Sequence, residues 1–276
     1  SGGQSGDRGW LNHQEVSDTI ICDNQILHIM KEKLQIGELV HGQIDFERRF
    51  DFMQHHTGEH IFSGLAYRKH GAVRVGFHLS DQSVTLDLNL NLAVNELLEV
   101  EQEVNQIIWE NQTVSTAIYE NDQLEELNYR SKKSLDGQVR LVTVDQVDCC
   151  ACCAPHLNQT GQVGAFVIQS MEKYKGGIRL AILCGKRAIK DHRNLLDQSA
   201  KLCGIFSSKP DQLADSASGL QQDLLSLKRK YDDLQLEYAK LKIGEANQPF
   251  ILYVTESMEA VIAKRLLLDM MDRNVG

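Results

Sequence analysis

The sequence predicts an α+β fold, because short β-like segments come first and helices and strands then mix without a strict βαβ alternation. A helix with a heptad repeat follows. The chain has 276 residues, long enough for two domains or for one domain with an appendage. We expect a small β-barrel-like unit over 1–48, a mixed α+β domain over 49–205, a coiled-coil-like linker over 206–245, and the start of a βα domain over 246–276.

The first unit is predicted from two apolar runs, 19–22 and 26–29, separated by turn-forming residues. A helix is then predicted over 50–70, where apolar and histidine side chains recur at helical spacing. The rest of the mixed domain contains an alternating strand at 83–88, an amphipathic helix at 92–111, a strand at 139–147, and two strands at 164–168 and 178–183 joined by a glycine turn.

The linker is predicted from a regular seam of large side chains. They alternate at spacings of four and three residues: Leu220, Leu224, Leu227, Tyr231, Leu234, Tyr238 and Leu241. Such a seam must be buried against a second helix, which belongs either to another copy of the chain or to the same chain. The strict register favours a homodimer through 213–241.

The two ends of the chain suggest a fragment. A strand at 250–254 and a helix at 257–271 would begin a βα unit that lacks a partner strand. The chain starts at Ser1, within what looks like a motif, and not at a methionine. We therefore expect a chain that is open at both ends.

The composition argues against a membrane protein. No apolar run approaches the roughly 18–20 residues that cross a bilayer, and no signal segment is evident, so a cytoplasmic location is expected. The formal net charge is −9, yet the window 171–193 holds seven basic and two acidic residues and is therefore +5. We expect phosphate contacts from the basic clusters, with a solvated surface as the alternative: Arg130, Lys132, Lys133, Lys173, Lys175, Lys186 and Arg187.

Two histidines on the first long helix are candidate metal ligands. His56 and His60 are four residues apart, so both imidazoles lie on one helical face. His55 with Glu59 is a poorer pair, because imidazole suits zinc better than carboxylate does. Thr57 stands where a metalloprotease of the HExxH type would carry its general-base glutamate.

A cysteine-rich element supplies the other candidate ligands. Cys152 and His156 lie in a segment that Pro155 and the preceding strand make a loop. With His56 and His60 they complete a tetrahedral set for one Zn²⁺ per chain. Cys149, Cys150 and Cys153 remain alternative ligands, and a row of buried thiols without metal is the competing interpretation.

These motifs resemble the editing domain of alanyl-tRNA synthetases and their free-standing AlaX relatives of the large form. The matching elements are His56-Thr-Gly-Glu-His60, Cys152-x-x-x-His156 and Thr160-Gly-Gln-Val-Gly164. The Gly-Gly-Gln loop at Gly2, Gly3 and Gln4, together with 76–80, 129–133 and 185–188, also fits that form. The resemblance covers nearly all of 1–210, and the rest resembles the linker and a truncated DHHA1-type domain.

The sequence departs from the family at two points. Cys153-Ala154-Pro155 replaces the usual Gly-Gly-Thr between the cysteine and histidine ligands, and Gln162 replaces a glutamate. The ligand types themselves are retained. The departure beside the metal bears on fine discrimination between substrates.

The resemblance implies a trans-editing hydrolase. Such proteins remove a wrong amino acid, serine or glycine, from mischarged alanine tRNA by hydrolysing its ester. It also implies substrate contacts from Gly2, Gly3, Gln4 and Thr57, with helix packing as the alternative role of Thr57. No proton-transfer residue is assigned; His78 is the one candidate, against a structural role.

Three functions remain open from the sequence alone. They are a free-standing deacylase, an editing segment of a full-length alanyl-tRNA synthetase, and a zinc-stabilised RNA-binding module without catalysis. The role of the metal is also open, because four protein ligands are typical of structural zinc whereas catalytic zinc keeps a position free.

Overall fold

The computed structural model describes residues 4–23, 25–124, 127–131, 137–244 and 258–273, in two compact units over 1–193 and 194–276. The strands are β1 (Gly9–Leu11), β2 (Gln14–Cys22), β3 (Gln25–Met30), β4 (Gly42–Ile44), β5 (Arg74–Leu79), β6 (Val84–Leu88), β7 (Val114–Tyr119), β8 (Val139–Val144), β9 (Asp148–Ala151), β10 (Phe166–Tyr174) and β11 (Gly177–Cys184). The helices are α1 (Phe46–His70), α2 (Val94–Glu110), α3 (Asn121–Leu124), α4 (Gly185–Phe206), α5 (Leu213–Gly244) and α6 (Ala260–Arg273). Gly2, Gly3, Lys132, Lys133 and the strand expected at 250–254 lie outside the described residues.

The N-terminal strands form a single antiparallel sheet. Its order is β3-β2-β1-β4, and β1 pairs with both β2 and β4. The two predicted strands are present as β2 and β3. Within the described residues this sheet does not close on itself, so the barrel-like closure expected from the sequence is not found there. The α+β class is confirmed.

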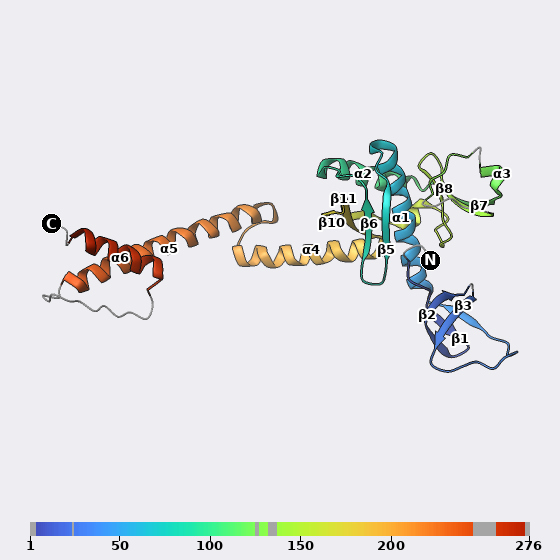
Figure 1. The fold of residues 1–276 in the computed structure, drawn as a ribbon, viewed down its shortest axis with the longest axis horizontal. Coiled ribbons are helices and arrows are strands. Elements are labelled where there is room, and N and C mark those ends of the chain that lie inside the picture. The colour runs from blue at the N-terminus through green and yellow to red at the C-terminus, as the bar shows by residue number, and fades with distance from the viewer. Residues whose placement is uncertain (1–3, 24, 125–126, 132–136, 245–257, 274–276) are drawn as a thin grey trace. The chain divides into compact units, whose positions relative to one another are not determined.

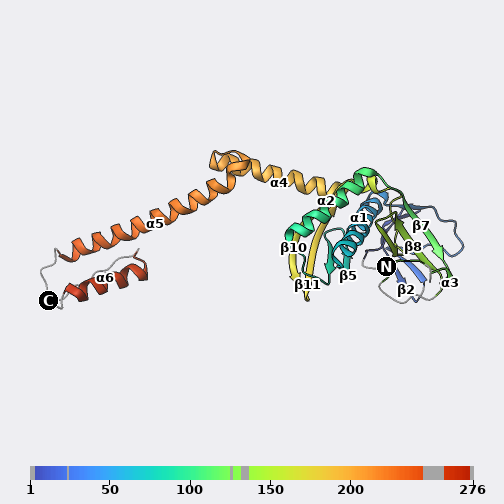
Figure 2. The same ribbon diagram turned by 90° about the horizontal axis from the view of Figure 1, so that it is seen from above.

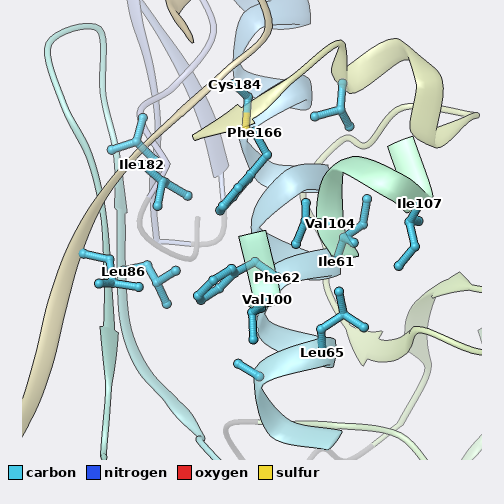
Figure 3. Close-up of a cluster of buried hydrophobic side chains, with 14 of the residues drawn as sticks. Ile61, Phe62, Leu65, Leu86, Val100, Val104, Ile107, Phe166, Ile182 and Cys184 are labelled. Atoms are coloured by element: carbon cyan, nitrogen blue, oxygen red, sulfur yellow. The ribbon is translucent and has the colours of Figure 1, made fainter. Parts of the chain in front are cut away.

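A second antiparallel sheet, β10-β11-β6-β5, packs against α1 and α2 and encloses the main core (Figures 1 and 2). Figure 3 shows Phe62 of α1 and Val100 of α2 beside Leu86 and Ile182 of the sheet. All four are buried. The helices predicted at 50–70 and 92–111 are present as α1 and α2. The apolar faces that predicted them pack into this core.

The third sheet, β7-β8-β9, carries the cysteine-rich segment.

Gln162, which replaces a glutamate of the family pattern, makes contacts that explain how the chain tolerates this replacement. Its side-chain oxygen accepts hydrogen bonds from the backbone N–H groups of Asn158 (3.1 Å) and Gln159 (3.3 Å). An amide oxygen therefore caps this 3₁₀ turn (Thr160–Val163) as a carboxylate would.

In the second unit, α5 spans the predicted heptad helix and α6 packs along it. The contact uses Ala239, Ile262 and Leu266, which are buried, and ion pairs such as Lys240–Asp269 at 2.9 Å. The heptad seam lies on a different face. Its seven side chains are 54–67% exposed. Within the described residues, no helix is both long and apolar enough to cross a bilayer.

Candidate metal centre

Helix α1 buries an unusual number of polar side chains. Its N-cap is Asp45, whose carboxylate accepts a hydrogen bond from the Arg48 backbone N–H, and its C-cap is Gly71 in the left-handed conformation (φ 65°). Every residue from 54 to 66 is buried. The polar members of that stretch are Gln54, His55, His56, Thr57, Glu59, His60 and Ser63. Burying them without partners would cost several kcal/mol in all, so each needs a partner.

The loop after β9 presents the other two ligands. Arg140 of β8 shapes this loop: its guanidinium donates to the carbonyls of Cys152 (2.8 Å) and Ala154 (2.9 Å), and its own carbonyl accepts from the Cys152 N–H (3.0 Å). Pro155 has no N–H to satisfy in this turn. The loop is thus held in one shape that places Cys152 and His156 over α1.

His56, His60, Cys152 and His156 converge at one point. Their ligand atoms all lie within 4.8 Å of one another. The Cys152 Sγ is 3.6 Å from Nε2 of His56 and 3.4 Å from Nε2 of His156. The ring centroids of His60 and His156 are 4.5 Å apart. Two imidazoles from a helix and a thiol–imidazole pair from a loop therefore surround one small volume.

A different polar group lies beside the Nδ1 of each histidine, and His56 and His156 present Nε2 to this volume. The His56 Nδ1 is 2.9 Å from the Gln4 side-chain oxygen, and the His156 Nδ1 is 3.3 Å from the Thr57 hydroxyl. The His60 Nδ1 lies 3.2 Å from the Asp148 carboxylate. Metal-bound histidines are typically held in this way through the nitrogen that does not bind the metal.

The donor set suits Zn²⁺. The Nε2 of His60 is fully buried and has no hydrogen-bond partner among the described residues. A metal ion held by the four side chains would satisfy that nitrogen, and three imidazoles with one thiolate are donors that zinc prefers.

The charge states of His56 and Cys152 agree with this assignment. Burial lowers the pKa of His56 to about 3, which keeps its imidazole neutral. Burial opposes ionisation of the Cys152 thiol, but His56 and His60 outweigh it and lower its pKa to about 5. For His60, burial is outweighed by Asp148, Cys152 and Glu59, which raise its pKa to about 9. A metal ion would have to displace the proton from His60, and the negative surroundings that hold that proton also favour a bound cation.

The remaining cysteines are less suitable ligands. Cys150 forms a second candidate group with His60 and Asp148. However, Asp148 is already paired with Arg130 at 2.6 Å, and burial raises the pKa of the Cys150 thiol to about 12. A neutral thiol is a poor metal ligand. Cys153 is exposed, and Cys149 accepts a hydrogen bond from Thr143.

Comparison with known proteins agrees with the sequence motifs. Residues 139–180, which include Cys152 and His156, match the tRNA_SAD family, the second additional domain of threonyl and alanyl tRNA synthetases. The chain is 29% identical over 246 residues to the alanyl-tRNA editing protein AlaX-L of Pyrococcus horikoshii, and 29% identical over 253 residues to the alanyl-tRNA editing protein Aarsd1-A of Xenopus laevis. It is also 28% identical over 260 residues to the alanine–tRNA ligase of Pyrococcus furiosus.

The chain is similar over most of its length to alanyl-tRNA editing proteins and to alanine–tRNA ligases. The resemblance inferred from the motifs is thereby confirmed. These alignments cover 86–88% of the chain. The chain spans 61% of each of the two editing proteins and 28% of the ligase.

Among the residues expected to bind substrate, two contact the metal ligands instead of open space. Gln4 reaches His56, as described above. Thr57 is fully buried, and its hydroxyl also accepts a hydrogen bond from the Leu157 N–H at 3.1 Å. His78 lies on β5 and is exposed, whereas its neighbour Phe77 contacts the His56 ring. Since successive strand residues point to opposite faces, His78 points away from the ligands.

The basic residues fall into two groups. Arg130 and Arg187 form internal ion pairs, with Asp148 at 2.6 Å and Asp51 at 2.5 Å. Lys173, Lys175 and Lys186 are exposed, and Lys186 pairs with Glu47 on the surface. The lysines therefore remain available to solvent, whereas the two arginine charges are balanced inside the protein.

Sequence reasoning missed the groups that hold the ligands: Asp148, Arg130 in its buried role, and Arg140. One signal was present, because Asp148 directly precedes the cysteine-rich element. An acid beside a Cys/His motif is a reasonable candidate to orient a histidine ligand. Nothing in the spacing indicated which histidine it would reach.

Proposed function

We propose that this protein hydrolyses the ester bond that links a wrongly attached amino acid, serine or glycine, to alanine tRNA, with one Zn²⁺ at the four-ligand centre. One observation carries the proposal: four zinc-type donors, three of them buried and Cys152 half-buried, converge from two segments about 90 residues apart, in a chain similar to alanyl-tRNA editing proteins. The names of those relatives support the activity, and the donor chemistry supports the metal.

The reaction asks little of the protein beyond positioning. Water adds to the ester carbonyl, the bond to the ribose oxygen breaks, and the free amino acid and an uncharged tRNA leave. An aminoacyl ester is already activated, so orientation and modest stabilisation of the oxyanion suffice. A bound Zn²⁺ would supply a Lewis acid for a substrate oxygen or an anchor for the amino group.

This chain's own residues would fix the geometry of the centre. Gln4 and Thr57 each hold one histidine ring through Nδ1. Gln4 also precedes the β1 strand and forms a β-bridge to Leu79, which ties the N-terminal segment to β5. We propose that Gly2 and Gly3, next to Gln4, admit the terminal adenosine or the amino acid, since glycine lets a backbone approach a ligand closely.

The need for such a site follows from the size of the amino acids. A binding pocket for alanine cannot exclude the smaller glycine, and it rejects the extra hydroxyl of serine only partly. We propose that the tRNA backbone is bound by the exposed lysines Lys173, Lys175 and Lys186, together with Lys132 and Lys133.

A second function is favoured by one specific observation. Four protein donors already complete a tetrahedral zinc site, which is the usual composition of a structural centre. The chain could then be a zinc-stabilised RNA-binding module without catalysis. A third assignment, as an editing segment of an alanine–tRNA ligase, shares the chemistry of the first.

Deacylation of charged alanine tRNA separates the first two. The zinc-loaded protein is incubated with seryl-, glycyl- and alanyl-tRNA for alanine, and the remaining ester is measured over time. We expect fast loss of serine or glycine, slow loss of alanine, and loss of activity in His60→Ala. His70→Asn is the matched control, because His70 lies at the end of the same helix and outside the ligand set.

Two outcomes would reject the deacylase. Equal decay with wild type and His60→Ala would mean that the centre plays no part in hydrolysis. Binding of both zinc and tRNA without any ester loss would instead favour the RNA-binding module.

We further propose that α5 forms a homodimer. Its seam of seven large side chains is 54–67% exposed, and α6 covers a different face of the helix. A parallel or antiparallel pairing of two seams would bury these leucines and tyrosines.

A further inference from the structure

Asp148 is a buried carboxylate that lies between a positive side chain and a metal ligand. Its side chain is 2% exposed. One oxygen, Oδ1, accepts a hydrogen bond from the Arg130 Nε at 2.6 Å. The other, Oδ2, lies 3.2 Å from the Nδ1 of His60. Neither Oδ2 nor that Nδ1 has a hydrogen-bond partner in the described part of the chain, so the two atoms face each other as an ion pair.

We propose that Asp148 is a positioning residue of the metal centre, which holds the Nδ1 side of His60 so that Nε2 points at the ion, and that Arg130 fixes Asp148 for this task. The inference rests on the proposed metal centre and not on deacylation. It assigns to Arg130 a role inside the protein, in place of the tRNA contact expected from its basic motif.

The backbone around Asp148 is built for this contact. The segment at Arg130 pairs with β9 through two hydrogen bonds, from the Arg130 N–H to the Cys149 carbonyl (2.8 Å) and from the Ala151 N–H to the Arg130 carbonyl (2.9 Å). Gly64 of α1 lets the turn before β9 approach the helix, because a Cβ there would lie 2.7 Å from the Asp148 Cβ. This close approach brings the Asp148 carboxylate within 3.2 Å of the His60 ring on α1.

The neighbouring acid, Glu59, is already engaged. It is fully buried, and its Oε1 lies 2.5 Å from the Ser63 hydroxyl and 3.0 Å from the Arg74 Nε. These partners hold one oxygen of Glu59, while its Oε2 has no hydrogen-bond partner among the described residues. Of the two acids, Asp148 is the one whose carboxylate forms an ion pair with His60, at 3.2 Å. This contact distinguishes an orienting role from a general excess of negative charge.

The test measures zinc affinity by competition with a chromophoric chelator, with the full chain. Asp148→Asn has one carbonyl oxygen for two donors, Arg130 and His60, so zinc affinity should fall by about 10- to 100-fold. Asp87→Asn is the matched control, because Arg179 binds the Asp87 carboxylate with two hydrogen bonds (2.7 and 2.9 Å) away from the four ligands. Its zinc affinity should stay within about twofold of wild type.

A second variant covers the case in which Asp148→Asn misfolds because Arg130 is left buried beside an amide. The double variant Asp148→Leu with Arg130→Met removes both charges together, which cores tolerate better than an unpaired charge. It keeps no acceptor for His60, so its zinc affinity should also fall by about 10- to 100-fold while its circular dichroism spectrum matches wild type.

Wild-type affinity in a folded double variant would overturn the inference and leave the metal centre intact. Failure of wild type itself to bind zinc would reject the metal centre first. Deacylation does not enter either result, so the two proposals fail separately.

Discussion

The close approach between α1 and the turn before β9 can be tested at Gly64. An ideal Cβ on Gly64 would lie 2.6 Å from the Val147 carbonyl oxygen and 2.7 Å from the Asp148 Cβ. Both contacts are shorter than side-chain carbons normally make, and neither neighbour is the free end of a flexible side chain. Gly64→Ala must therefore push β9 and its turn away from the helix.

Two opposing effects set the size of the change. Alanine in place of glycine within a helix gains about 1 kcal/mol. Overpacking a tight contact costs typically about 1–3 kcal/mol, and two hard contacts place this site near the upper end. We therefore expect a net loss of about 1–2 kcal/mol. The shift should also carry Asp148 away from His60 and weaken zinc binding.

Hydrogen exchange of α1, followed by mass spectrometry, measures the local stability, because a chain with two compact units need not unfold in one step. Gly219→Ala in α5 is the matched control, since no heavy atom lies within 4 Å of its Cβ position among the described residues. That variant should stabilise its own helix by up to about 1 kcal/mol. If Gly64→Ala also slowed exchange and kept wild-type zinc affinity, the proposed packing would be wrong.

Two further substitutions test other parts of the structure. Thr57→Val keeps the shape of the side chain but leaves the Leu157 N–H and His156 Nδ1 without their partner, so stability should fall by about 1–3 kcal/mol and zinc affinity with it. Thr57→Ser, which keeps the hydroxyl, should bind zinc as wild type does; equal behaviour of the Val and Ser variants would contradict this role. Leu227→Asp with Leu234→Asp should reduce the mass in solution from dimer to monomer, whereas Ser226→Asp, at an exposed position of α5 outside the seam, should not. A wild-type protein that is already monomeric would refute the dimer.

The sequence predicted the elements with a strong local period. α1, α2 and α5 were expected from apolar spacing, because a helix of 3.6 residues per turn repeats its buried face along the chain. The strands β5 and β7 were missed. Most of their side chains are not buried, so the alternation that marks a strand is absent. The long helix α4 was missed as well, since only Gly185 and Ala188 of its residues are buried.

The sequence by itself also determined which side chains could bind a metal. His56 and His60 share a face by helical geometry, and Cys152 with His156 supply donors of the matching kind. The tertiary structure decided which groups hold them. Gln4 meets His56 across 52 positions, and Thr57 meets His156 across 99. Such contacts depend on how the sheets and helices pack. A local period carries no information about that packing, and it therefore could not show that Asp148 reaches His60.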